Sequence, residues 1–550
     1  MELQESEKFD PNDEGLLDTN HFVENSYILM VGYLISSIIS TIGSILVIRL
    51  ISIEEYSLVT IAFILPSILI PMGELGLNYA STNFIARKMK ENDLKGVKSI
   101  IRINLIVKVI VGLIFTFLVI YFSVFIAKEI YKINDDRISI LIQISAIAII
   151  SSILYDTINS FFIGAQKMRL VQYGAILRTV LRTFLSVFLV LIGLTIIGPI
   201  LGYVLSSSIV VIIYAFFLLK TFKFNIEKEK GTNWKEFSRM IKYGYPLLIF
   251  SIIAGIQGQI FILILTVYGY LNEVSFFHLA IISGGAITIL TKAISFSLFP
   301  IFSKMDWNNN DEQKTLINYF QFSIKFSTLL IVPVVILVIL FSGDIFPIIY
   351  GNSYTDATPF ISTYFLMFLL VSFGSLSIPA FFNGQRQTKY VLYITLIELS
   401  TSVIFALFLI SYFGAIGLVY GVILGSIVSV LYGYIVIRKK YGKALFSNFK
   451  NVFLIFFIAI IIGVFIYYLN RTVLSILPIK GIVIRIVFLA ISIIIYGIIF
   501  LFLIGILSLI SIDEIDFLAN SFQKFPLINK VIKILAKIEK KIITLRFKEG

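Results

Sequence analysis

The chain has 550 residues, of which 58% are hydrophobic and only 14% charged, and its mean hydropathy is +0.97. No soluble fold can bury that much apolar surface, so the composition predicts an all-α polytopic membrane protein. The net charge of +13 would indicate nucleic acid in a soluble domain, but the basic residues follow the membrane topology here, and no nucleic-acid partner is expected. Cys is absent and the two His lie far apart, so we expect no disulfide, no metal site and no cofactor.

Residues 1–25 are acidic and polar, which predicts a solvated tail without a signal peptide. Fourteen apolar runs follow, each long enough for the roughly 20 helical residues that cross a bilayer. The predicted spans are 26–48, 56–82, 103–127, 138–162, 173–193, 197–219, 244–268, 274–299, 319–341, 358–380, 390–410, 415–437, 452–469 and 482–510. The basic end, 511–550, has apolar residues at helical spacing and predicts an amphipathic helix on anionic lipid headgroups, with a partner-binding helix as the alternative.

The Lys and Arg residues outside the spans lie mainly in alternate loops. The N-terminal tail, the even-numbered loops and the C-terminal tail hold 33 of them, whereas the opposite loops hold 6. Because basic loops stay in the cytoplasm, this bias predicts a multi-pass cell-membrane protein with both termini in the cytoplasm.

One stretch of the sequence occurs twice. The segment 161–167, Phe-Phe-Ile-Gly-Ala-Gln-Lys, returns at 381–387 as Phe-Phe-Asn-Gly-Gln-Arg-Gln, and each copy continues into two apolar spans. In the second of these spans Gly198 and Gly202 correspond to Gly417 and Gly421. An earlier match, Glu55-Tyr56-Ser57 with Glu273-Val274-Ser275, extends the duplication toward the start of the chain. The pattern is typical of a transporter built from parallel repeats.

The repeat divides the chain into two six-helix lobes and an addition. We expect an N-terminal lobe at 26–219, a basic cytoplasmic linker at 220–243 and a C-terminal lobe at 244–437. The last two spans, within 438–510, lie outside the duplication. The largest external loop, 342–357, has the length of a lid, and no motif for nucleotide phosphate, catalytic zinc or a nucleophilic serine occurs in a supporting context. The sequence therefore argues against an enzyme.

Ionisable residues within the spans are the candidate site residues, because each is costly when it faces lipid. Arg178 and Arg182 are four residues apart and share one helix face, where their guanidinium groups could bind a phosphate. The alternative is that Arg178 reaches the cytoplasmic interface and Arg182 pairs with Asp156 on the adjacent helix. Lys108, Lys325 and Arg485 are expected to extend toward span ends.

The repeat also relates charges of opposite sign. Arg178 corresponds to Glu398 at an offset of 220 residues, and Glu74 corresponds to Lys292 at an offset of 218. We therefore expect opposed charges on the two lobes of a central cleft. The alternative for Glu74 and Lys292 is an ion pair that locks the lobes together.

Several motifs resemble those of a known family. The segment 49–57, Arg-Leu-Ile-Ser-Ile-Glu-Glu-Tyr-Ser, resembles the R-x-L-x-x-x-E-(Y/F)-G end of the first helix of polysaccharide transporters, with Ser57 in place of the usual Gly. Glu74 to Asn78 followed by Ala86 to Lys88 resembles the end of their second helix, and the repeated Phe-Phe-x-Gly loops resemble their hairpins. Together these motifs resemble the O-antigen (Wzx-like) flippase branch of the multidrug/oligosaccharidyl-lipid/polysaccharide exporter superfamily.

The resemblance implies a two-lobed bundle that moves polyprenyl-linked oligosaccharide outward by alternating access, among membrane lipids. By resemblance Arg49, Arg178, Arg182 and Lys292 become candidates for pyrophosphate or glycan contact, although Arg49 could equally cap a helix. Candidate coupling ions are H⁺ or Na⁺, and candidate partners are a glycan polymerase or glycosyltransferases.

Two other functions stay open. A cation-coupled drug exporter of the same superfamily would use carboxylates in the N-terminal lobe, for which Glu74 and Asp156 are available. A non-transporting scaffold for envelope synthesis would use the basic tail for docking and would tolerate neutral residues at every intramembrane charge.

Overall fold

The computed structural model describes residues 19–222, 234–307, 309–442, 449–476 and 481–507, together with Leu509. Its contacts divide the chain into two compact units, Met1–Gly255 and Ile256–Gly550, and the boundary lies within one long helix, α10 (Trp234–Val267). The predicted lobe boundary at residue 244 remains a prediction. Residues 1–18 of the predicted acidic tail, residues 223–233 of the linker and the tail beyond Leu509 lie outside the described residues.

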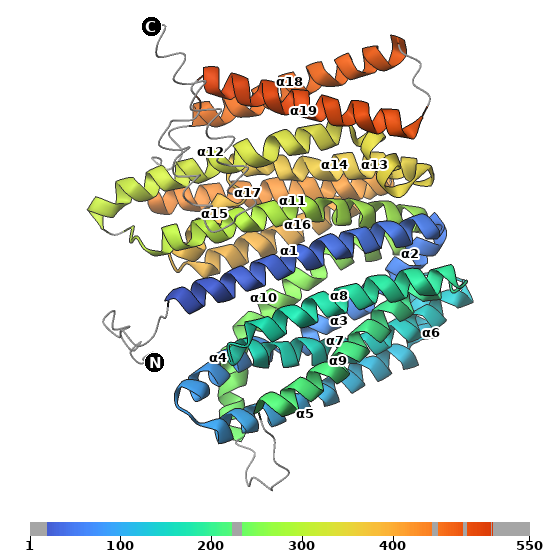
Figure 1. Ribbon diagram of the computed structural model, residues 1–550, viewed down its shortest axis with the longest axis vertical. Coiled ribbons are helices and arrows are strands. Elements are labelled where there is room, and N and C mark those ends of the chain that lie inside the picture. Colours follow the sequence, from blue (N-terminus) through green and yellow to red (C-terminus); the bar gives the residue numbers. More distant parts are fainter. Residues whose placement is uncertain are drawn as a thin grey trace. The chain divides into compact units, whose positions relative to one another are not determined.

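Among the described residues, six of the candidate membrane spans lie wholly in the first unit. Figure 1 shows its helices. In chain order its helices are α1 (Thr19–Leu50), α2 (Ile53–Ala62), α3 (Ile64–Gly73), α4 (Leu77–Lys90), α5 (Leu94–Tyr121), α6 (Ser123–Phe125), the π-helix η1 (Ile126–Ile130), α7 (Asp136–Gly164), α8 (Met168–Leu191) and α9 (Ile197–Phe222). Helices α2, α3 and α4 together form the second span, and the first half of α10 also belongs to this unit. Helix α7 packs against α4, α5 and α9, and α8 packs against α1 and α9.

The second unit contains the remaining spans. Its helices are α11 (Leu271–Ser303), α12 (Asn310–Leu340), α13 (Ser342–Tyr350), the 3₁₀ helix η2 (Asn352–Ala357), α14 (Thr358–Phe365), the 3₁₀ helix η3 (Leu366–Phe373), α15 (Ser377–Gly384), α16 (Thr388–Phe413), α17 (Ala415–Tyr441), α18 (Phe449–Ile476) and α19 (Ile482–Ile506). The last two lie side by side, in orange and red in Figure 1, and α18 packs on α12. A buried hydrogen bond from the Asn470 side chain to Ser492 Oγ joins α18 to α19.

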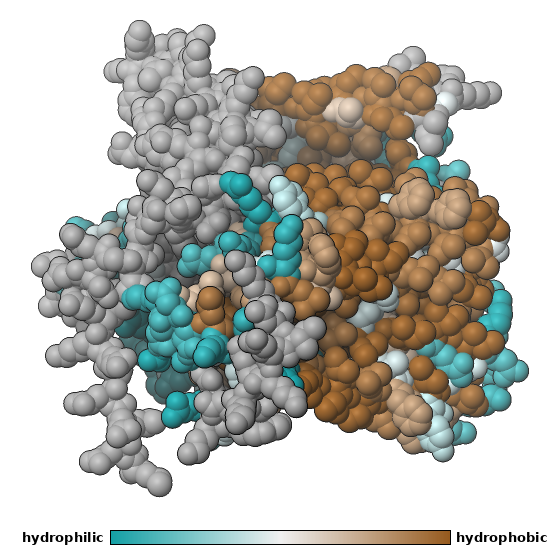
Figure 2. All heavy atoms as spheres, turned by 60° about the horizontal axis from the view of Figure 1, so that its bottom comes forward, coloured by the Kyte–Doolittle hydropathy of each residue, from teal (hydrophilic) through white to brown (hydrophobic). Residues whose placement is uncertain are grey.

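The all-α polytopic architecture predicted from composition is confirmed. Within the described residues twelve helices are long and apolar enough to cross a membrane, and α10 and α11 occupy the remaining two predicted spans. Apolar side chains cover a broad area of the described surface, as Figure 2 shows in brown. Phe117, Phe184 and Phe216 are among the exposed aromatic side chains, and an apolar surface is what lipid contact requires.

The two repeated loops have the same backbone structure. Gln166 and Arg386, 220 residues apart, both adopt the left-handed conformation at φ 56°. In each copy the next residue donates its N–H to the carbonyl five positions back, from Lys167 to Phe162 and from Gln387 to Phe382, both at 2.8 Å. This hydrogen bond ends the preceding helix and starts the hairpin. The sequence repeat therefore encodes a repeated helix corner.

The repeated glycines lie where the two helices of each hairpin touch. A Cβ at Gly202 would come within 2.6 Å of the backbone nitrogen of Ser186, and a Cβ at Gly421 within 2.3 Å of that of Ala406. Glycine at these positions allows α9 to approach α8, and α17 to approach α16, at backbone contact. This explains why the glycines recur at the same offset.

Replacing Gly421 with alanine should lower the thermal stability of the purified protein. The added Cβ meets backbone atoms, which cannot move aside as a flexible side chain can, and we expect a cost of about 2 kcal/mol. Heating followed by size-exclusion chromatography measures the loss of monodisperse protein. Gly497→Ala in α19 is the matched control, because nothing lies within 4 Å of its Cβ position. Equal midpoints for the two variants would contradict this packing.

In each unit a left-handed turn interrupts one span, and the interrupted span differs between the units. In the first unit the second span breaks between α3 and α4, where Leu75 and Gly76 are left-handed. In the second unit the tenth span passes through η3 and breaks at Gly374, with φ 87°. The repeat equivalents, Ile294 for Gly76 and Leu154 for Gly374, both lie within continuous helices. Interrupted helices in transporters commonly expose backbone groups to a substrate or ion.

Candidate functional site

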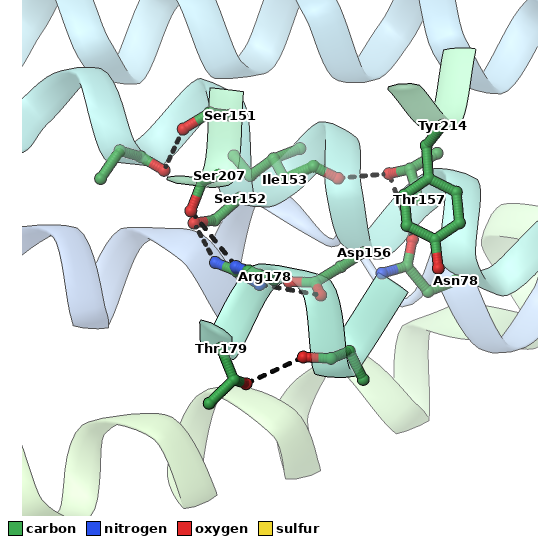
Figure 3. A network of polar contacts seen from close by, with 12 residues as sticks. Asn78, Ser151, Ser152, Ile153, Asp156, Thr157, Arg178, Thr179, Ser207 and Tyr214 are labelled. Atoms are coloured by element: carbon green, nitrogen blue, oxygen red, sulfur yellow. Dashed lines mark hydrogen bonds and ion pairs between the residues drawn. The ribbon is translucent and has the colours of Figure 1, made fainter. Parts of the chain in front are cut away.

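Arg178 of α8 is the centre of a polar network inside the first unit (Figure 3). Its guanidinium group donates to Ser152 Oγ at 2.9 Å, to Ser207 Oγ at 3.2 Å and to the Tyr203 hydroxyl at 3.2 Å. It also lies 4.0 Å from the Asp156 carboxylate and 4.5 Å from the centre of the Tyr155 ring. With a side chain only 19% exposed, Arg178 is held by partners on α7 and α9.

Arg182, one turn farther along α8, has a different environment. Its guanidinium carbon lies 4.7 Å from the centre of the Tyr203 ring, an arrangement typical of a cation–π contact. Within the described residues it makes no hydrogen bond or ion pair, and its side chain is exposed. Its five N–H donors are therefore available to an acceptor that the described chain does not supply.

Both arginines lie deep in the span. Helix α8 begins at Met168, five residues before the predicted start. At 1.5 Å per residue, Arg178 lies about 15 Å and Arg182 about 21 Å from that end of the helix. The alternative in which Arg178 reaches the interface is therefore wrong. The predicted pairing of Asp156 with Arg182 is also wrong, because Asp156 pairs with Arg178.

A second group of charges adjoins this network. Lys108 of α5 is completely buried, and its ammonium group donates to the backbone carbonyl of Gly73 at 3.0 Å and to that of Glu74. Lys108 also interacts electrostatically with the carboxylates of Glu74 and Asp156. The expectation that Lys108 extends to a span end is wrong. Its role in the structure is to bind the interrupted second span.

The candidate residue of the second unit lines a cavity. Glu398 of α16 accepts a hydrogen bond from Ser426 Oγ of α17 at 3.0 Å. It lies in the wall of a cavity of about 300 Å³ whose lining is mainly apolar and includes both sides of the break at Gly374. Thr288, Thr395 and Ser429 add hydroxyl groups to the wall. A mainly apolar wall with a few polar groups is typical of small-molecule pockets.

Two predicted site residues lie elsewhere. Arg49 is exposed in the last turn of α1, where a cation complements the helix dipole. Lys292 belongs to α11, but its side chain lies outside the described residues. Opposed charges across a cleft, and an ion pair between Glu74 and Lys292, therefore stay predictions.

The motif after the first span has a clear structural role. Glu55 accepts a hydrogen bond from the Ser52 backbone N–H at 2.8 Å, and the Glu55 N–H donates to Ser52 Oγ at 3.2 Å. This reciprocal capping box starts α2. The glutamate of the motif is therefore part of the turn between the first two spans.

A family model described as "Polysaccharide biosynthesis protein" matches residues 22–306. The chain belongs to the polysaccharide biosynthesis protein family. A second model, "Lipid II flippase MurJ", matches residues 280–489. The two matches place the chain in the multidrug/oligosaccharidyl-lipid/polysaccharide exporter superfamily, in its lipid-linked flippase branch, as the motifs predicted.

A curated relative matches the sequence, and solved structures match the fold. The chain is 26% identical over 385 residues to the uncharacterized membrane protein MJ1068 of Methanocaldococcus jannaschii, a match that covers 67% of this chain and 73% of that protein. Among solved structures, the lipid II flippase MurJ in an inward closed conformation matches with a TM-score of 0.64 and 16% identity, covering 86% of this chain and 98% of that one. An inward-facing MATE family multidrug transporter matches with a TM-score of 0.60 and 16% identity, and the match covers 78% of this chain and 99% of that one.

Sequence reasoning missed the polar partners of the arginines. Tyr155 and Lys108 were not among the candidates, nor were the hydroxyl residues. One signal could have found most of them: three neighbouring helices each carry polar residues four positions apart within an apolar run, namely Ser152 with Asp156, Arg178 with Arg182, and Tyr203 with Ser207. Residues four apart share a helix face, so such pairs can meet in one network.

Proposed function

We propose that this protein is a flippase that moves polyprenyl pyrophosphate-linked oligosaccharide from the cytoplasmic to the outer leaflet of the cell membrane. Membership in the lipid-linked flippase branch supports transport of a glycolipid. The proposed cycle is alternating access, with the lipid tail remaining in the bilayer and both termini in the cytoplasm.

The observation that carries this proposal is the environment of Arg182. A guanidinium group inside the membrane needs acceptors for its N–H groups, and none comes from the described chain. A pyrophosphate supplies several oxygen acceptors and a negative charge, which suits the planar fork of arginine. Stacking on Tyr203 holds this fork in place. Arg182 is the proposed headgroup contact, whereas Arg178 is occupied by Asp156 and three hydroxyl groups.

Transbilayer movement in liposomes tests the proposal. Purified protein is reconstituted with a fluorescent polyprenyl-pyrophosphate oligosaccharide, and a membrane-impermeant quencher reports the fraction in the outer leaflet. Movement that requires the protein supports a flippase. Movement of neither this lipid nor any small cation would favour the envelope scaffold and overturn the proposal.

Glu398 is the proposed site of the coupling ion, H⁺ or Na⁺. Its carboxylate lines the cavity of the second unit, and within the described residues it makes no ion pair. A glycan polymerase or glycosyltransferases would be the partners that use or supply the transported lipid. These partners follow from the proposed substrate.

Replacing Glu398 with glutamine should remove the effect of an ion gradient on transport. The amide keeps the shape of the carboxylate but cannot take up a proton or bind Na⁺ as an anion, so we expect the gradient-driven rate to fall by about tenfold. The liposome rate is measured with and without a pH or sodium gradient. Glu273→Gln, in the first turn of α11, is the control and should retain the gradient effect. An unchanged gradient effect in the Glu398 variant would exclude this site.

The cavity around Glu398 also favours a second candidate, a cation-coupled exporter of small organic cations. A carboxylate in a mainly apolar wall suits an amphipathic cation, and about 300 Å³ is the lower end of the usual ligand-pocket range. Efflux of such cations under an ion gradient, with no movement of the glycolipid, would establish this function instead.

A further inference from the structure

The second span is interrupted in a way that leaves a backbone carbonyl without its helical partner. In a continuous helix the Gly73 carbonyl would accept the N–H of Leu77. Here Leu77 donates to the Glu74 carbonyl instead, at 2.8 Å. Leu75, with φ 51°, and Gly76, with φ 66°, turn the chain between α3 and α4. A leucine in this conformation is uncommon and is held only where its surroundings require it.

Lys108 supplies a hydrogen-bond donor to the carbonyls at the break. Its ammonium group donates to the carbonyl of Gly73, the last residue of α3, and to the carbonyl of Glu74, the C-cap residue of that helix. A cation at the C-terminal end of a helix is favourable, and this one is completely buried. The same face of α5 carries Asn104, one turn away, whose side chain donates to Ser81 Oγ within α4. Helix α5 therefore binds both sides of the interruption.

The break connects the charged network to α10. Glu74 and Asp156 both interact with Lys108, and Asp156 pairs with Arg178. On its other side the break meets α10 at backbone contact: a Cβ at Gly76 would come within 2.0 Å of the Gly244 carbonyl oxygen. A break that relaxed into a regular helix would change both the direction of Glu74 and this contact.

We propose that Lys108 is a positioning residue that holds the second span broken at Glu74–Gly76. It thereby sets the placement of the Glu74 side chain, next to Asp156, and the close approach of α10. The inference concerns helix geometry and does not depend on which molecule is transported. Only its transport measurement rests on the proposed function.

Hydrogen–deuterium exchange of the full chain in lipid nanodiscs tests the proposal. Lys108→Met removes the charge and the donor, Lys108→Gln keeps a neutral donor, and Lys108→Arg keeps the cation. We expect peptides that cover residues 70–80 to exchange about tenfold faster in the Met and Gln variants and at the parent rate in the Arg variant. Leu113→Ala is the matched control, because it changes an exposed position on the same helix and should leave the break unchanged.

Glycolipid transport gives the second measurement. Loss of Lys108 removes one of the two cations that interact with Asp156 and leaves Arg178, so Arg178 should move toward Asp156 and away from Tyr203, and the stacked Arg182 should lose its fixed position. We expect the KM for the fluorescent polyprenyl-pyrophosphate oligosaccharide to rise about tenfold with a smaller change in maximal rate, and the Arg variant to restore the parent KM.

The outcomes separate this proposal from the proposed function. Parent-like exchange at residues 70–80 in both the Met and the Gln variants would overturn the role of Lys108, as would failure of Lys108→Arg to restore it. If the Met variant does not accumulate as folded protein, the exchange rate of residues 70–80 in the Gln variant tests the role of Lys108. Altered exchange together with a parent protein that moves no glycolipid would support Lys108 as the positioning residue and reject the flippase.

Discussion

Replacing Arg182 with alanine should lower glycolipid movement in liposomes by about a hundredfold while leaving the amount and stability of the protein unchanged. Two charge-assisted hydrogen bonds to a pyrophosphate are worth about 3 kcal/mol together, which corresponds to this factor. Stability should be unaffected because Arg182 makes no hydrogen bond or ion pair within the described residues. The measurement is the initial rate of quencher-accessible fluorescence at matched protein density.

Two further variants test whether transport requires the guanidinium group at this position. Arg182→Lys keeps the charge but loses the planar fork, so it should recover only part of the activity. Arg485→Ala removes an exposed arginine from α19, outside the duplicated spans, and should transport at the parent rate. If Arg182→Ala transports as fast as Arg485→Ala, the headgroup does not bind at Arg182.

Replacing Arg178 with methionine should act on stability first. The change leaves the Asp156 carboxylate without its guanidinium partner and removes a donor from Ser152, Ser207 and Tyr203, which lie on two packed helices. Removing one member of a largely buried ion pair costs about 3 kcal/mol, so we expect a lower thermal midpoint and less folded protein. The midpoint is read by size-exclusion chromatography after heating.

The partner residue provides the control for Arg178. The double variant Arg178→Met with Asp156→Asn removes the unpaired charge and should recover a large part of the lost stability. Arg182→Ala should not shift the midpoint. A stable Arg178→Met protein that has lost only transport would place Arg178 in contact with the substrate, beside Arg182.

The architecture could be predicted because its signals can be read without knowing any spatial contact. Apolar run length depends on residues near one another in the chain, and the repeat is found by comparing the sequence with itself, so the all-α fold and the hairpin glycines were both accessible. The break in the second span could not be predicted in this way. The two carbonyls before the left-handed Leu75, those of Gly73 and Glu74, are bound by Lys108, which lies more than thirty positions away in the sequence.

The candidate site was predicted in part. Charge within an apolar run selected Asp156, Arg178 and Arg182 correctly as neighbours, since no such residue can face lipid cheaply. Which arginine pairs with Asp156 depends on the angular position of α7 around α8, and a four-residue spacing does not determine it. Lys108 was expected to extend toward a span end, because position along a span does not show which face of α5 is buried.

The two interruptions also show how far the halves of the repeat have diverged in backbone geometry. Two identical halves would carry every break at the same place. Here the first half is broken at Gly76 and the second at Gly374, and neither has the other's break at the equivalent position. The two halves therefore share their helix corners but differ in which span is interrupted, so the backbone groups that a break exposes differ from one half to the other.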